Sequence, residues 1–175
     1  CCFIINGKTC NALCQTPNIK NYFKFTFIKT FTKLKNGILN KKVRLMNSYE
    51  QFNEQLKTAA EAFKQIDKKE VIRLISHLDA DGISACAIMI KLLNNDNRKY
   101  SVSTVQQLNK DVLKQLAAEP YNCFIFTDIG SGVISDVKEL LKGRKVFVLD
   151  HHSVENADFG DIVFVNPHIY GIDGG

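Results

Sequence analysis

The chain has 175 residues, 45% of them hydrophobic, which suits one globular domain with its own core and leaves little room for a second. No run of eighteen or more apolar residues occurs, so the sequence predicts no membrane span and no membrane partner. The net charge of +5 is unevenly distributed: residues 1–45 hold nine basic and no acidic residues, whereas residues 46–175 hold fourteen basic and eighteen acidic ones.

Residues 1–45 begin with Cys and mix Asn, Lys, Thr and Phe without helical periodicity, whereas Met46 opens a well-patterned stretch. We expect the native protein to begin at Met46 and the preceding segment to be an upstream translation or a sequence artefact. Three functional alternatives stay open. The interleaved lysines and aromatic residues could bind single-stranded nucleic acid. A transit peptide would be richer in Arg and Ser, and a zinc site at Cys10 and Cys14 would need a further ligand pair nearby.

From residue 48 onward, hydrophobic periodicity predicts an amphipathic helix over 48–66, with Ser48 as its N-terminal cap. The remaining sequence alternates between short apolar runs and helical patterns. The predicted strands are 71–76, 100–105, 123–127, 146–149 and 162–165, and the predicted helices are 83–93, 110–118 and 135–141, the last ended by Gly143. This alternation predicts an α/β fold in which βαβ units build a parallel sheet with helices on both faces.

Cys86 lies in one of the predicted helices and Cys123 opens one of the predicted strands. We expect both to be buried, reduced thiols, since free cysteine packs as a small apolar residue. Reduced thiols favour a cytoplasmic location.

Polar residues with metal-binding or catalytic chemistry follow four of the predicted strands, and all four histidines of the chain are among them. They are His77, Asp79 and Asp81 after 71–76; Asp128 after 123–127; Asp150, His151 and His152 after 146–149; and Asn166 and His168 after 162–165. Parallel sheets place their ligand sites beyond the carboxyl ends of the strands, so these side chains are expected to converge on one crevice.

Each of these residues has an ordinary structural explanation when taken alone, since a single Asp after a strand usually caps a helix or forms a turn. Several carboxylates gathered without a countercharge would repel one another, and the three motifs contain no Lys or Arg. Metal ions are the simplest source of the missing charge. Carboxylate and imidazole ligands without thiolate suit Mn²⁺ or Mg²⁺, and the number of ligands indicates two ions. Such a pair favours phosphoester hydrolysis.

Three motifs occur in order: His77-x-Asp79-x-Asp81-Gly82, the strand-end Asp128, and Asp150-His151-His152. They resemble motifs one, two and three of the DHH phosphoesterase superfamily. The strings "SHLDADGISA", "FTDIGSG" and "VLDHHS", followed by "VNPHIYGIDGG", are most similar to RecJ-like single-strand-specific exonucleases, particularly the archaeal ones. The resemblance extends from about residue 71 to residue 175.

The resemblance implies a role for each motif residue. His77 and Asp79 would bind one metal ion, Asp81 and His151 the other, and Asp128 would bridge both and be essential for catalysis. His152 would contact the substrate phosphate as a catalytic hydrogen-bond donor or cation. Asp150 would orient a neighbouring imidazole or merely end its strand. We also predict substrate contacts from Asn166 and His168, with a simple turn as the alternative, and a weaker phosphate-approach role for the loop 130–132.

Two features of the superfamily are not found in this sequence: the metal-binding Asp of motif four and the DHH-associated domain that grips the substrate. We therefore interpret residues 46–175 as the amino-terminal part of a DHH domain, which alone would be inactive or weakly active. The resemblance implies a DNA-repair exonuclease that uses two divalent cations, Mn²⁺ preferred or Mg²⁺. Its partners would be single-stranded DNA or RNA and replication or repair proteins.

Two other functions stay open. One is a phosphodiesterase of the same superfamily for oligoribonucleotides or cyclic dinucleotides, and the other is a non-catalytic replisome scaffold related to RecJ. Some scaffold relatives have lost metal ligands, whereas this sequence retains every metal-binding residue of the three motifs, which favours catalysis.

Overall fold

The computed structural model describes residues 4–5, 8–9, 47–154 and 158–174. The chain divides into two compact units, Cys1–Met46 and Asn47–Gly175. The described residues of the first unit form an antiparallel pair, β1 (Ile4–Ile5) and β2 (Lys8–Thr9). Cys10, Cys14 and the aromatic residues of the predicted basic arm lie outside the described residues, so the alternatives for this segment stay predictions.

The second unit is built on a five-stranded sheet in which every neighbouring pair of strands is parallel. The strands are β3 (Ile72–His77), β4 (Tyr100–Val105), β5 (Cys123–Thr127), β6 (Lys145–Leu149) and β7 (Val163–Val165), and their order across the sheet is β4-β3-β5-β6-β7. All five residues of the apolar strand β5 are buried, as expected of a central strand covered on both faces.

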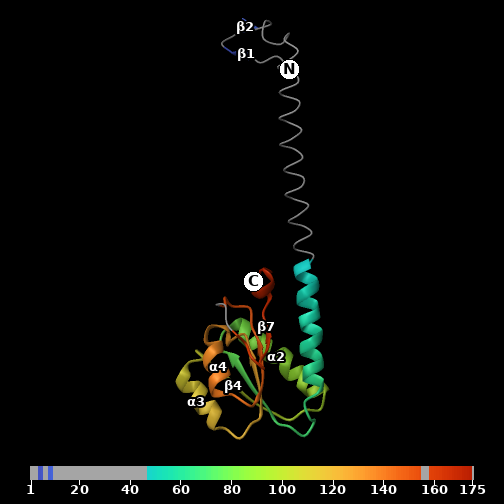
Figure 1. Ribbon diagram of the computed structural model, residues 1–175, viewed down its shortest axis with the longest axis vertical. Helices are drawn as coiled ribbons and strands as arrows, with labels where there is room; N and C mark the ends of the chain where they lie inside the picture. The colour runs from blue at the N-terminus through green and yellow to red at the C-terminus, as the bar shows by residue number, and fades with distance from the viewer. Residues whose placement is uncertain (1–3, 6–7, 10–46, 155–157, 175) are drawn as a thin grey trace. The chain divides into compact units, whose positions relative to one another are not determined.

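Helices cover both faces of this sheet (Figure 1). The helix over 47–64 and α2 (Ala80–Asn95) lie on one face, whereas α3 (Lys110–Ala118) and α4 (Ile134–Leu140) lie on the other. The 3₁₀ helices η1 (Ser131–Val133) and η2 (Pro167–Tyr170) follow β5 and β7. The predicted α/β fold with a parallel sheet and helices on both faces is therefore confirmed. One local expectation was wrong: Ser48 lies within the first helix, which already includes residue 47, so it does not cap it.

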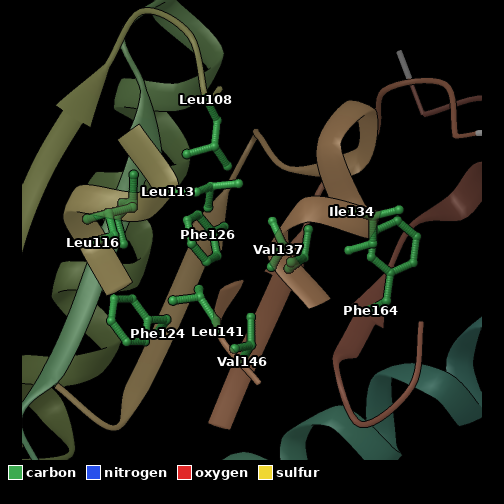
Figure 2. Packing of buried hydrophobic residues seen from close by; sticks show 12 residues of the cluster. Leu108, Leu113, Leu116, Phe124, Phe126, Ile134, Val137, Leu141, Val146 and Phe164 are labelled. Atoms are coloured by element: carbon green, nitrogen blue, oxygen red, sulfur yellow. The ribbon is translucent and has the colours of Figure 1, made fainter. Parts of the chain in front are cut away.

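Each face of the sheet carries its own apolar core. In Figure 2, Leu113 and Leu116 of α3 and Val137 of α4 pack over Phe124 and Phe126 of β5. The opposite core contains Ile66, Ile72, Leu74, Cys86, Leu93, Cys123, Ile125 and Phe147. These clusters fix the sheet from both sides, so the loops at its carboxyl edge extend from a rigid base.

Cys86 and Cys123 are both buried and both free, as predicted. Burial raises the pKa of the Cys123 thiol to about 11. Nothing among the described helices is long and apolar enough to cross a membrane.

The order of the strands reverses beside β3, because β4 pairs with one edge of β3 and β5 pairs with the other. Loops that leave neighbouring strands toward opposite faces open a crevice at such a reversal, and ligands of parallel α/β sheets bind there. The carboxyl ends of β3 and β5 are therefore where the fold itself would place a site. His77 is the last residue of β3, and Asp128 directly follows β5.

Candidate metal centre

The connection from β3 to α2 places the first motif. Asp79 is the N-cap of α2, and its Oδ1 accepts a hydrogen bond of 2.9 Å from the backbone N–H of Gly82. This bond holds the pKa of Asp79 below its ordinary value. Gly82 packs directly on the strand end, where an added Cβ would lie 2.6 Å from the carbonyl carbon of His77. The capping bond and the close approach explain why Asp and Gly occupy these positions, and they start α2 three residues before the predicted residue 83.

His77 turns one ring nitrogen away from the site and the other toward it. Its Nε2 lies 3.1 Å from the carbonyl oxygen of Gln106, and this nitrogen must carry the proton because a carbonyl can only accept. Nδ1 lies 2.9 Å from Asp79 Oδ2 and 3.7 Å from Asp128 Oδ2, yet it makes no aligned hydrogen bond. In the neutral ring, the Nδ1 lone pair therefore faces two carboxylates. A cation between them would turn this repulsion into coordination.

Asp128 lies at the centre of the cluster, and only 5% of its surface is exposed. Its backbone φ of 58° falls in the left-handed region, which Asp and Asn tolerate better than other non-glycine residues. Oδ1 lies 3.0 Å from His151 Nε2, whereas Oδ2 is buried without a hydrogen-bond partner in the described part of the chain. Burial first, and then the nearby charge of Asp79, raise the pKa of the Asp128 carboxyl. Negative charge here is costly unless a cation compensates it.

Asp150 holds the double-histidine segment in place. Its carboxylate accepts hydrogen bonds from the backbone N–H of Ser131 at 2.8 Å and of His151 at 2.8 Å, and it lies 2.7 Å from His152 Nδ1. Burial works to raise the pKa of Asp150, but the bonds from Ser131 and His152 together hold it below its ordinary value. The hydrogen bond between Asp150 and His152 also raises the pKa of the His152 imidazole. Since Nδ1 of His152 is engaged, its Nε2 remains to contact a ligand, and half of this side chain is exposed.

Asn166 supports the same segment from the end of β7. It is fully buried, and its Nδ2 donates to the carbonyl oxygen of His152 at 2.8 Å and to Ser131 Oγ at 3.0 Å. Its Oδ1 accepts from the backbone N–H of His168 at 2.9 Å. With no exposed surface, Asn166 braces the loops, and this geometry does not favour the predicted contact with substrate. His168 is exposed and lies outside the ligand groups described below.

The predicted phosphate loop also differs from expectation. Its central N–H, that of Ser131, already donates to Asp150 and so does not point at a ligand. Two participants were missed by sequence reasoning, the carbonyl of Gln106 and the N–H of Ser131. Both of these contacts are made by backbone groups, so the residue types do not reveal them, although the side chain of Ser131 also accepts a bond from Asn166.

Two groups of side chains offer ligand atoms within 4.8 Å of one another, and Asp128 belongs to both. One group is His77, Asp79 and Asp128, and the other is Asp128, His151 and His152. Asp81 is exposed and outside both groups, but it lines a cavity of about 530 Å³ together with Asp128 and His151. The oxygen and imidazole donors and the two unpartnered buried atoms fit divalent cations such as Mn²⁺ or Mg²⁺.

Comparison with known families shows which group the chain belongs to. Residues 71–171, which contain all five strands of the parallel sheet, match the DHH family, N-terminal domain. The chain belongs to the DHH family. The resemblance predicted from the three motifs is thereby confirmed, and the DHH family is one of metal-dependent phosphoesterases.

A curated relative of this DHH chain is the uncharacterized protein MJ0831 of Methanocaldococcus jannaschii. The two are 35% identical over 133 residues, which cover 69% of this chain and 30% of the relative. The DHH chain therefore spans less than a third of that protein.

Two solved structures share the fold. RecJ of Thermus thermophilus in complex with Mn²⁺ has a TM-score of 0.53 at 22% identity, covering 71% of this chain and 18% of that one. An exonuclease RecJ bound to manganese has a TM-score of 0.55 at 21% identity, covering 66% and 31%. At this level of identity the comparison confirms the α/β architecture of the DHH domain.

Proposed function

We propose that this protein hydrolyses phosphodiesters with two divalent cations, as a RecJ-like exonuclease acting on single-stranded nucleic acid. One observation carries the proposal: the buried Asp128 belongs to two adjacent ligand groups at the reversal of strand order. A carboxylate shared by two adjacent ligand groups could hold two ions close together, as two-metal hydrolysis of phosphoesters needs. The RecJ structures with the same fold are described as bound to manganese, which supports Mn²⁺ as the preferred ion.

The residues would divide the work as follows. His77 Nδ1, Asp79 and Asp128 would hold one ion, and Asp128, His151 and the nearby Asp81 the other. Divalent cations held there supply Lewis-acid polarisation of the phosphoryl group and activate water near neutral pH.

His152 would act on the substrate directly. Because Asp150 fixes its Nδ1, the exposed Nε2 would donate a hydrogen bond to a phosphoryl oxygen as negative charge develops there. Asp150 would thus set both the orientation of the ring and which nitrogen carries the donated proton. Asn166 would hold the backbone of the same residue through its carbonyl oxygen.

The test is a calorimetric titration of the full chain with Mn²⁺, combined with cleavage of an end-labelled single-stranded oligonucleotide. Asp128→Asn is the sharpest variant, because Asn keeps the shape and tolerates the left-handed backbone while removing the charge. Asp128→Ala adds backbone strain. Asp161→Asn, at an exposed aspartate outside both ligand groups, is the matched control.

We expect the wild-type chain to bind about two ions and Asp128→Asn to lose both, with any cleavage falling at least about a hundredfold. Asp161→Asn should behave as wild type. Two ions bound by Asp128→Asn with unchanged affinity, or cleavage at the wild-type rate, would refute the two-metal assignment. Since the chain spans less than a third of its curated relative, ion binding is the primary readout.

A further inference from the structure

A second cavity, of about 490 Å³, opens beside the metal centre between two loops. One loop leads from β4 into α3 and contributes Gln106 and Gln107, and the other follows β5 and contributes Gly132. His77 and His152 line the same cavity, so it meets the metal centre directly. Its volume is within the range of pockets that hold a small organic ligand, and a nucleoside would fit.

Away from the metal centre the lining of this cavity is uncharged, and it combines apolar residues such as Leu108 and Val133 with the polar side chains of two glutamines. The side chains of Gln106 and Gln107 are exposed and make no hydrogen bond with any residue in the described part of the chain. Each amide offers donors and an acceptor, the combination that matches the edge of a base or the hydroxyls of a sugar. Neither Lys nor Arg is among the lining residues, so a second phosphate would find no counterion here.

We propose that this cavity binds the nucleoside part of a nucleotide whose phosphate lies at the metal centre, with Gln106 and Gln107 bonding its base or sugar. The inference rests on the proposed function for the position of the phosphate. The same loop also fixes His77, because the Gln106 carbonyl accepts from its Nε2. Nucleoside recognition and metal ligation therefore share one short segment.

The experiment compares two ligands on the full chain by calorimetry in Mg²⁺: thymidine 5′-monophosphate, and inorganic phosphate, which lacks the nucleoside. Gln107→Ala removes one amide. Gly132→Leu fills the cavity from the opposite loop, where a Cβ would meet nothing within 4 Å. Gln115→Ala, on the exposed surface of α3, is the matched control. Urea unfolding of each variant verifies the fold.

The wild-type chain should bind the nucleotide at least about tenfold more tightly than phosphate, since each hydrogen bond of this kind contributes up to about a factor of ten. Gln107→Ala and Gly132→Leu should each reduce or abolish this difference and leave phosphate binding unchanged. Gln115→Ala should preserve it.

Equal affinity for the two ligands in the wild type would overturn the inference, as would a preference that survives both cavity variants. Failure to bind Mg²⁺ or phosphate at all would refute the proposed function instead. The two failures are therefore distinguishable.

Discussion

The buried amide of Asn166 provides a quantitative test of the site architecture. Replacing Asn166 by Ala removes two donated bonds, to His152 and Ser131, and one accepted bond, from His168. At about 1 kcal/mol per bond, the free energy of unfolding should fall by about 3 kcal/mol. Urea unfolding of the full chain, followed by circular dichroism, measures this change.

Asn109→Ala is the control, because the Asn109 side chain accepts two backbone N–H bonds, at 3.1 and 3.0 Å, but as the exposed cap of α3. Asn109→Ala should lower the free energy of unfolding by about 1 kcal/mol. Asn166→Asp keeps the acceptor but places a carboxylate against the carbonyl of His152, so it should be at least as destabilising as Asn166→Ala. If Asn166→Ala costs no more than Asn109→Ala, the three bonds do not brace the loops and the reasoning fails.

Three further predictions concern buried positions of the fold. Gly82→Ala should destabilise the chain by about 2 kcal/mol, because the added Cβ meets the backbone of His77; an unchanged melting temperature would contradict this. Arg98→Met should lower the free energy of unfolding in urea by about 3 kcal/mol, since the fully buried Arg98 side chain donates to three backbone carbonyls at the end of the first helix; a loss under about 1 kcal/mol would show that these bonds are dispensable. Cys123, with its pKa of about 11, should resist iodoacetamide at pH 8 until urea is added, as peptide mass mapping would reveal.

The bounds of a strand or helix were predictable where a single hydrophobic pattern dominated its sequence. The strand at 123–127 and the helix at 110–118 appear with the predicted bounds, because the strand is an unbroken apolar run and the helix has a clear periodic stripe. Once strands and helices alternate, a parallel sheet follows, and its carboxyl edge is where motif residues must meet. The gathering of His77, Asp128 and His151 was therefore predictable from order along the chain alone.

Other parts of the site depend on contacts that sequence does not encode locally. Asn166 precedes a proline and so indicates an exposed turn, but its side chain is fully buried between two other loops. Asp79 was assigned to metal binding, yet it is also the cap of α2, and a cap and a ligand favour the same residue type. The bond from Ser131 to Asp150 joins residues nineteen apart through the backbone. Each of these contacts forms only once the sheet has packed, so the sequence alone does not predict it.

Asp128 combines features that each oppose folding: a left-handed backbone, burial, and a carboxylate oxygen without a hydrogen-bond partner among the described residues. Folding raises the pKa of the Asp128 carboxyl. At a pH above that pKa the carboxyl is ionised, and its charge then lowers the free energy of unfolding of the protein. Asp128→Asn, which removes the charge but tolerates the backbone, should therefore be more stable than wild type at pH 8 in EDTA.

Saturating Mn²⁺ should reverse that order. An ion at about a hundred times its dissociation constant stabilises the chain that binds it by about 2.7 kcal/mol, a gain that the variant would lack. Urea unfolding of both proteins in EDTA and in Mn²⁺ measures whether the order of their stabilities reverses. If Asp128→Asn were less stable in both conditions, the carboxylate would be stabilising the fold, and its place between two ligand groups would have to be explained by structure and not by metal binding.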